Sequence, residues 1–367
     1  MLPSDRIDPP PEQDDSFSPP VPAQCQLGRQ MHLHPAPVHY LLITFKRLKG
    51  GCDVITLRVL RIFMIATACA LAAPAVVAST LYVANGGGNS IFAYATSPLA
   101  QPTTFVPSGS GGLNSPAGVA FGPDGNFYVT GGQPGQPSTY GVYQYNGTSG
   151  AFMGMFASTT AYPFGLVFED GSLFVSEIGN GSVERFDAST GAPFGTFVLS
   201  GSGGLSAARD LIFGPDGNLY VSSPGTLSVL RYNGTTGAFI DKFATNVDAR
   251  GLRFGPDGNL YVASYGGNHV LEFNGSTGAS MGVFASGSGM DGPVGLLFGP
   301  DDQMYVSSFN NGEILRYNGS TGAFIDTIAM GDGLSMPRLM TIPEPGTIAL
   351  LGVGLASLGI GRRKRKR

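Results

Sequence analysis

Three arginines recur at similar places in an internal repeat. Arg209, Arg250 and Arg338 each stand at the start of a short apolar segment, and Asp210 follows the first of them. Guanidinium groups that converge can bind a carboxylate through paired hydrogen bonds, which would suit uronic or other acidic sugars. The alternative is structural, because charged residues often satisfy backbone groups or pair with a nearby aspartate where repeats meet. Both interpretations stay open at this stage.

Metal-dependent hydrolysis would need several oxygen ligands aimed at one point. Where the repeated middle segments end, the sequence offers only Asn85 and Glu177, and the other copies have glycine or serine. These two residues join the arginines and Asp210 in one predicted ligand mouth. His269 could serve as a lone general base, but most of the other repeats hold serine or glutamate there, as at the exposed start of a strand. We predict no catalytic residue, no metal site and no cofactor.

The segments that carry these residues repeat along the chain. One phrase, "GVAFGPDGNFYV" from Gly118, returns in variant form, and its central acid falls at Asp124, Asp170, Asp216, Asp257 and Asp301. The intervals of 46, 46, 41 and 44 residues are typical of propeller blades or of helical HEAT repeats. Turn formation explains the recurring acids without a bound calcium ion.

The turn sequences and the glycine content favour propeller blades over helical repeats. In the fourth copy "GLRF" leads through the turn "GPDG" to "NLYVAS", and "HVLEF" leads through "NGSTG" to "ASMGVFA". Pro-Asp-Gly and Asn-Gly suit tight turns between strands, and four strands joined in this way make a propeller blade. Helical repeats would not tolerate 56 glycines, because each interior glycine costs about 1 kcal/mol relative to alanine.

An aromatic residue marks each middle strand and sets the number of blades at six: Tyr82, Tyr128, Phe174, Tyr220, Tyr261 and Tyr305. The first copy lacks a preceding inner strand, whereas residues 338–342 match the inner-strand pattern after the last copy. We therefore predict an all-β, six-bladed propeller of four-stranded blades over residues 79–342. The strand Arg338–Ile342 would complete the first blade and close the ring.

The repeat resembles the NHL family and the related propellers of the streptogramin-lyase type, in its inner strand, its "DGN-[IL]-Y-V" segment and its "V-x-[RQ]-[FY]" strand. The resemblance spans roughly residues 80–342. It implies the fold and no single activity, because propellers serve as lyases, lactonases and binding modules. We expect the irregular connections 130–141 and 200–210 to contact a partner.

The chain ends in "IPEPGTIALLGVGLASLGIGRRKRKR". As a helix the uncharged part would be roughly 24 Å long, enough to enter a bilayer core of about 30 Å, with the basic tail on the cytoplasmic side. This order of elements in residues 343–367 resembles the PEP-CTERM sorting signal of Gram-negative bacteria, which implies a transient inner-membrane anchor removed by an exosortase. The match assigns sorting and processing to Pro343, Glu344, Pro345, Arg362, Arg363, Lys364 and Arg365.

Export requires a second signal, and residues 57–78 have its features. Arg58 and Arg61 precede the apolar segment 62–73, and small residues stand before Ser79, as in a signal peptide with a helical core. Residues 1–56 open with "DPPPEQDDSFSPP", which is proline-rich and polar and cannot bury enough apolar surface to fold. We interpret them as the result of a start codon assigned too far upstream, with a disordered cytoplasmic extension as the alternative.

Charge limits the classes of partner that we expect for the exported part, and its cysteine content can be counted directly. From Ser79 to Pro345 the chain has 8 Lys and Arg against 19 Asp and Glu, a difference of 11 negative charges. Nucleic acid is therefore not expected as a partner, because phosphate binding needs concentrated positive charge. All three cysteines precede Ser79, so the exported part would contain none.

Two hypotheses follow from the sequence. The first is a non-catalytic exported surface or extracellular-matrix propeller, processed by an exosortase, that associates with an acidic exopolysaccharide or a surface protein. The second is an extracellular lyase or lactonase-type hydrolase. We favour the first, because too few His, Asp, Glu or Asn residues stand at matching positions of the repeats.

Overall fold

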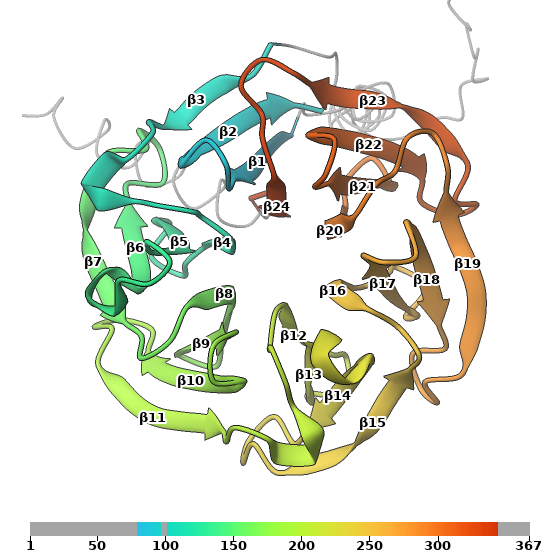
Figure 1. Ribbon diagram of the computed structural model, residues 1–367, viewed down its shortest axis with the longest axis horizontal. Coiled ribbons are helices and arrows are strands. Elements are labelled where there is room, and N and C mark those ends of the chain that lie inside the picture. The colour runs from blue at the N-terminus through green and yellow to red at the C-terminus, as the bar shows by residue number, and fades with distance from the viewer. Residues whose placement is uncertain (1–78, 97–100, 344–367) are drawn as a thin grey trace, which may run out of the picture. The chain divides into compact units, whose positions relative to one another are not determined.

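Six four-stranded antiparallel sheets are arranged in a ring in the computed structural model, which describes residues 79–96 and 101–343 (Figure 1). Inner strands lie nearest the centre and outer strands form the rim. The first three sheets consist of β24 (Pro337–Thr341), β1 (Thr80–Asn85), β2 (Ser90–Ala95) and β3 (Thr103–Val106); β4 (Val119–Phe121), β5 (Phe127–Gly131), β6 (Gly141–Tyr145) and β7 (Phe152–Ser158); and β8 (Pro163–Glu169), β9 (Ser172–Glu177), β10 (Ser182–Asp187) and β11 (Pro193–Val198).

The other three sheets have the same order from centre to rim. They consist of β12 (Leu211–Phe213), β13 (Leu219–Ser223), β14 (Ser228–Tyr232) and β15 (Phe239–Thr245); β16 (Ala249–Phe254), β17 (Leu260–Ser264), β18 (His269–Phe273) and β19 (Ser280–Ser286); and β20 (Pro293–Phe298), β21 (Gln303–Ser308), β22 (Glu313–Asn318) and β23 (Phe324–Met330). Within the described ranges, four 3-10 turns lie in connections: η1 (Ser110–Gly112), η2 (Pro137–Thr139), η3 (Ser202–Gly204) and η4 (Pro224–Thr226). The predicted six-bladed, four-stranded propeller is confirmed.

The recurring acid between inner and middle strands stabilises its own turn. Asp216 Oδ1 accepts a hydrogen bond from the Asn218 backbone N–H at 3.1 Å, and Oδ2 accepts one from the Tyr220 hydroxyl at 3.0 Å. Asp124, Asp257 and Asp301 make the same pair of bonds. Asp170 differs, because its middle strand has Phe174 in place of the tyrosine, and it adopts φ 44° in the turn itself. The turn interpretation is therefore confirmed for Asp124, Asp216, Asp257 and Asp301.

Aromatic packing holds the blades together. The Tyr220 ring meets Phe243 of its own outer strand at 4.9 Å between centroids and Phe254 of the next inner strand at 5.1 Å, both nearly edge to face. Tyr82, Tyr128, Phe174 and Tyr261 repeat this arrangement. Edge-to-face pairs add about 0.5–1.5 kcal/mol each beyond the area they bury, so this repeated motif explains the aromatic marker seen in the sequence.

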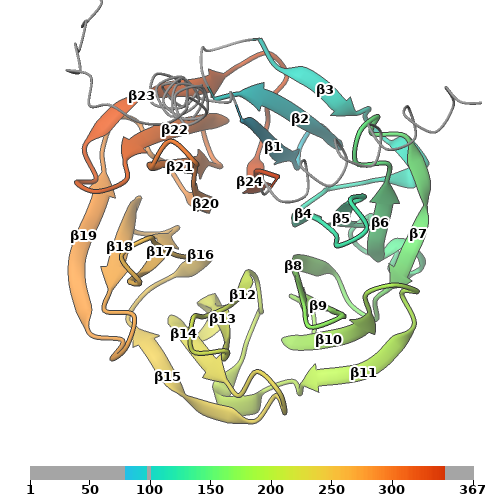
Figure 2. The same cartoon turned by 180° about the vertical axis from the view of Figure 1, so that it is seen from behind.

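Ring closure uses both ends of the described chain. β24 pairs with β1 so that Tyr82 lies opposite Thr341 and Val83 opposite Met340, and the two strands lie side by side in both views (Figure 2). At this seam Tyr305 packs in a cluster with Ile328 of its own outer strand and with Ile342, which follows the next inner strand. Phenylalanines hold these two places in the other blades. The prediction that the C-terminal strand completes the first blade is confirmed, with the strand at Pro337–Thr341.

Glycines and hydroxyls fix the inner strands close to the axis. A Cβ at Gly165 would lie 2.7 Å from the Arg209 carbonyl oxygen, so this approach of neighbouring blades requires glycine. The Ser222 hydroxyl donates to the Arg250 carbonyl at 2.8 Å, and Ser307 donates to the Arg338 carbonyl at 2.8 Å. Thr130 and Ser176 donate in the same way to the carbonyls of Phe164 and Arg209. Each hydroxyl thus connects a middle strand to the inner strand of the next blade.

Several sequence predictions concern segments outside the described residues. These are the extension 1–56, the signal peptide 57–78, and the sorting signal beyond Pro343 with its apolar helix and basic tail. Within the described ranges, no helix has the length and apolar character that a bilayer span requires.

Candidate functional site

One residue from each inner strand or its entry stands at the same register position near the axis. The six, which we call the axial ring, are Ala117, Phe164, Arg209, Arg250, Val294 and Arg338. The apolar members belong to one buried cluster with Leu339, against which Ile178, Tyr265 and Phe309 pack. The three arginines of the predicted mouth thus share one ring with three apolar residues. The hydroxyl bonds described above hold the backbone of all three arginines and of Phe164.

Arg209 carries the least compensated guanidinium of the ring. Its charge centre lies 5.0 Å from the centroid of the Phe164 ring, and its buried Nε–H has no hydrogen-bond partner among the described residues. Burial, followed by the charges of Arg250 and Arg338, lowers the pKa of Arg209 to about 10. The group is still cationic at neutral pH, but it lacks the counter-charge that would compensate its burial.

Arg338 reaches across the ring from the closing strand. Its Nη1 donates to the Ser115 carbonyl at 3.0 Å and to the Tyr162 hydroxyl at 2.9 Å, and Tyr162 in turn donates to Ser115 at 2.6 Å. The guanidinium lies 5.8 Å from the centroid of Phe164, the ring that Arg209 also covers. These bonds fix Arg338 and occupy one of its nitrogens.

Arg250 is more fully compensated. Its Nε lies 3.2 Å from Asp248 Oδ1, and its charge centre lies 4.5 Å from the centroid of the Tyr265 ring. The Asp248 contact is an ion pair and not a hydrogen bond, so the buried Nε–H of Arg250, like that of Arg209, has no hydrogen-bond partner among the described residues. The Tyr265 hydroxyl donates to Asn310 at 2.9 Å, which fixes that ring in place. Asp248 also accepts a bond from the Gly266 backbone N–H at 3.2 Å. For Arg250 the structural interpretation therefore has direct support.

Asp210 serves the backbone. Its side chain is buried, and its two oxygens accept the N–H groups of Leu211 at 3.0 Å and of Leu252, in the next blade, at 2.9 Å. Burial raises the pKa of this carboxyl despite the opposing charge of Arg253. Asp210 occupies the register at which four of the other five blades have glycine and the first blade has Leu339, and it replaces a close backbone approach with a hydrogen-bonded bridge.

Glu177 and Asn85 also hold loops. Glu177 is fully buried, and its Oε1 accepts the backbone N–H groups of Thr160 at 2.8 Å and Ala161 at 3.1 Å. Asn85 donates to the Gly333 carbonyl at 3.0 Å and accepts the Ser335 N–H at 2.8 Å. Both residues stand at the ends of middle strands, as predicted, but their polar atoms are engaged by the loop that enters the inner strand.

A cavity of about 350 Å³ lies beside the axial ring. Arg209, Arg338 and Phe164 contribute to its wall, together with Ser115, Pro134, Tyr140, Tyr162, Ile178 and Gly179. Pro134 and Tyr140 belong to the connection 130–141 that was predicted to contact a partner, and Tyr140 meets Tyr162 edge to face at 5.5 Å. Two cationic groups and an apolar, largely aromatic wall therefore face the same space.

Sequence reasoning missed the aromatic members of this cavity. Phe164 stands at the same register as the arginines, immediately before a glycine of the repeat, so aligning the repeats would have found it. Tyr162 and Tyr140 lie in connections whose path no periodic pattern predicts. His269, at the start of β18, lines neither this cavity nor the one at the seam of the ring described below. Within the described ranges, no group of three His, Cys, Asp or Glu side chains could hold a metal ion.

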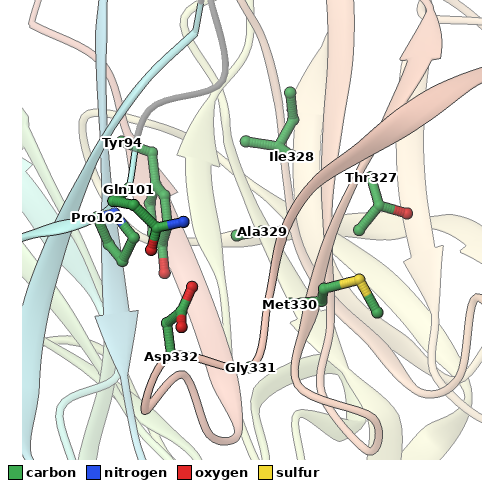
Figure 3. A pocket seen from close by; sticks show the side chains of 9 residues that line it. All are labelled: Tyr94, Gln101, Pro102, Thr327, Ile328, Ala329, Met330, Gly331 and Asp332. Atoms are coloured by element: carbon green, nitrogen blue, oxygen red, sulfur yellow. The ribbon is translucent and has the colours of Figure 1, made fainter.

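A second cavity, of about 290 Å³, lies at the seam between β23 and the first blade (Figure 3). In three other blades a phenylalanine at the start of the outer strand packs on a tyrosine, as Phe239 does on Tyr232 at 5.8 Å. The first blade has Gln101 at that register, next to Tyr94, and its outer strand is shorter. The third and fifth blades also lack this phenylalanine, with Pro193 and Ser280 at the register, so we attribute the cavity to the missing ring together with the shorter outer strand.

Comparisons with known proteins address the fold and the C-terminal segment. A chain in the crystal structure of a nidogen/laminin complex is 16% identical, with 72% of this chain and 98% of that chain covered and a TM-score of 0.59. A protein of unknown function from Bacteroides caccae is 13% identical, with coverages of 72% and 98% and a TM-score of 0.57. Virginiamycin B lyase from Staphylococcus aureus is 17% identical, with coverages of 61% and 73% and a TM-score of 0.47. At such identities the first two show the fold alone.

No curated protein matches the sequence. Residues 341–366 match the family described as the PEP-CTERM protein-sorting motif, which indicates export and sorting to the bacterial cell surface. The motif begins at Thr341, the last residue of the strand that closes the ring. The chain is therefore a six-bladed β-propeller followed directly by a PEP-CTERM sorting motif.

Proposed function

We propose that this protein is a non-catalytic component of the cell surface or extracellular matrix of a Gram-negative bacterium. An exosortase processes it near Pro343, Glu344 and Pro345, after a transient stay in the inner membrane. The processed propeller associates with an acidic exopolysaccharide or a surface protein through the mouth formed by the arginines of the axial ring. The sorting motif and the closed propeller support the first part of this proposal.

One observation carries the binding role. Arg209 and Arg338 line the same cavity, and Arg209 has no hydrogen-bonded or ionic partner among the described residues. Two arginines elsewhere in the propeller do form ion pairs: Arg231 Nη2 lies 2.5 Å from Asp241 Oδ2, and Arg316 Nη2 lies 2.6 Å from Asp326 Oδ2. Arg185 and Arg253 form hydrogen bonds without an acid, to Ser172 and to the Leu296 carbonyl. In a segment with 19 acids and 8 bases, an uncompensated guanidinium at a cavity favours an anionic ligand.

Binding is tested with the processed chain, residues 79–343, which contains every strand of the six sheets. Calorimetry with polygalacturonate and alginate should show binding that weakens in high salt, and neutral dextran should show none. The R209Q variant should lose most of this binding, whereas R185Q, which removes an arginine of β10 bonded to Ser172, should not. Equal binding of dextran, or equal loss in both variants, would refute the proposal.

Processing is tested by mass spectrometry of terminal peptides from the native host, with and without its exosortase. The expected mature form begins near Ser79 and ends near Pro343, and the basic tail persists only in the strain without the peptidase. A basic tail in both strains would contradict processing. The alternative of a lyase or lactonase stays a prediction, because no feature of the described residues specifically favours it.

A further inference from the structure

The cavity beside the axial ring has the size of a site for a small ligand. Its volume of about 350 Å³ lies near the lower end of the range of roughly 300–1,000 Å³ for small-molecule sites. Its wall combines apolar and aromatic groups with a few polar atoms, which is also typical of such sites. A ligand of one ring fits this volume better than a segment of polymer.

The polar groups of the wall select a carboxylate. Arg209 and Arg338 both lie over Phe164, at 5.0 and 5.8 Å, so two cationic groups flank one apolar ring. Arg209 forms no ion pair with any described residue although it contributes to the cavity wall, so a carboxylate in the cavity could supply the counter-charge and accept hydrogen bonds from the guanidinium. Arg338 is held by Ser115 and Tyr162 and is therefore preorganised as the second donor.

The remaining wall suits a sugar ring. Tyr140 and Tyr162 meet edge to face at 5.5 Å, and Ile178 and Pro134 line the same space. Such side chains can pack against the C–H groups of a pyranose. The bonds among Arg338, Ser115 and Tyr162 join the closing strand to two loops at one wall of the cavity. We expect this wall to mark the end of the site, so that a polymer would enter with its terminal residue.

We propose that this cavity binds a single carboxylated sugar ring, as a free uronate or as the terminal residue of an acidic polysaccharide. The inference rests on the proposed function of the mouth. It specifies the acidic partner as a single uronate ring, bound at the end of its chain. Arg209 and Arg338 hold the carboxylate, and Tyr140 and Tyr162 pack on the ring. One propeller therefore binds one chain end, whatever the length of the polymer.

Calorimetry on residues 79–343 tests this with four probes: D-galacturonate, its methyl ester, D-galactose and galacturonate oligomers of defined length. We expect galacturonate to bind with one molecule per propeller and the ester and galactose to bind at least about tenfold more weakly. Oligomers should bind with the same one-to-one ratio at every length. Galacturonate binding no tighter than galactose, or a number of propellers that rises with oligomer length, would overturn the inference.

Variants locate the binding. R209Q should weaken galacturonate binding about tenfold or more, and I178W should block it by filling the cavity while leaving every arginine in place. R185Q is the matched control and should bind as the parent does. Thermal unfolding of each variant shows that it is folded. Binding of polygalacturonate that survives I178W, with no competition by galacturonate, would leave the acidic partner intact and refute the end-on uronate.

Discussion

The hydroxyl of Ser222 makes a quantitative test of how the centre of the propeller is held. It accepts the Asp210 backbone N–H at 2.9 Å and donates to the Arg250 carbonyl of the next blade at 2.8 Å. Both Ser222 and Asp210 are buried, so water cannot replace the lost bonds in a Ser222→Ala variant. An orphaned buried donor costs about 1–3 kcal/mol, and the lost bond to the carbonyl costs about 0.5–1.5 kcal/mol. We expect the free energy of unfolding to fall by about 2–4 kcal/mol.

Equilibrium unfolding in urea measures this change. The midpoint should fall while the slope m stays constant, because the variant changes a local contact and not the surface exposed on unfolding. S276A is the control, since the exposed Ser276 uses its backbone N–H, and not its hydroxyl, to bond Asn274; it should stay within about 0.5 kcal/mol of the parent. A Ser222→Ala variant as stable as S276A would refute the idea that these hydroxyls hold the blades.

Three further results follow from the same geometry. Ala263→Ser, which gives the fifth blade a hydroxyl facing the Val294 carbonyl near Gly251, should raise the free energy of unfolding by about 1 kcal/mol in urea titrations; an unchanged midpoint would contradict this. Gly165→Ala should destabilise by about 1–3 kcal/mol, because its Cβ would lie 2.7 Å from the Arg209 carbonyl oxygen; a thermal midpoint equal to the parent's would count against the close approach. Hydrogen bonds from the Ser189 hydroxyl and N–H, and from Thr190, lower the pKa of Asp187 to about 2. Its stabilising effect should therefore be complete above the ordinary pKa of 3.8 and disappear as the pH falls through about 2, and an NMR titration should show a higher pKa in S189A.

The propeller itself could be predicted because its signals are local and repeated. The Pro-Asp-Gly turn, the aromatic residue of the middle strand and the offset between the first and last copies give the blade number and the closing strand. The turn acids were correctly interpreted, since Asp216 needs only its neighbours Asn218 and Tyr220 to form its bonds.

The site could be predicted only in part, because its chemistry depends on non-periodic loops. Position along the strand cannot show that Glu177 is engaged by Thr160 and Ala161, or that Asp210 bridges to Leu252. Nor does it show which arginine is paired. Arg250 forms an ion pair with Asp248, two residues before it. Arg209 forms no ion pair with a described residue, and Asp248 affects its pKa only through its charge.

The closing strand has a consequence for the life of the chain in the cell. β24 completes the first sheet, supplies Arg338 to the mouth and ends at the residue where the sorting motif begins. During synthesis β1 is made early and must wait for its partner until nearly the whole chain has left the ribosome. A chain truncated before Pro337 would lack the ring closure, Arg338 of the mouth and the sorting motif. Only a chain synthesised through this short segment can therefore close the ring and carry the sorting motif.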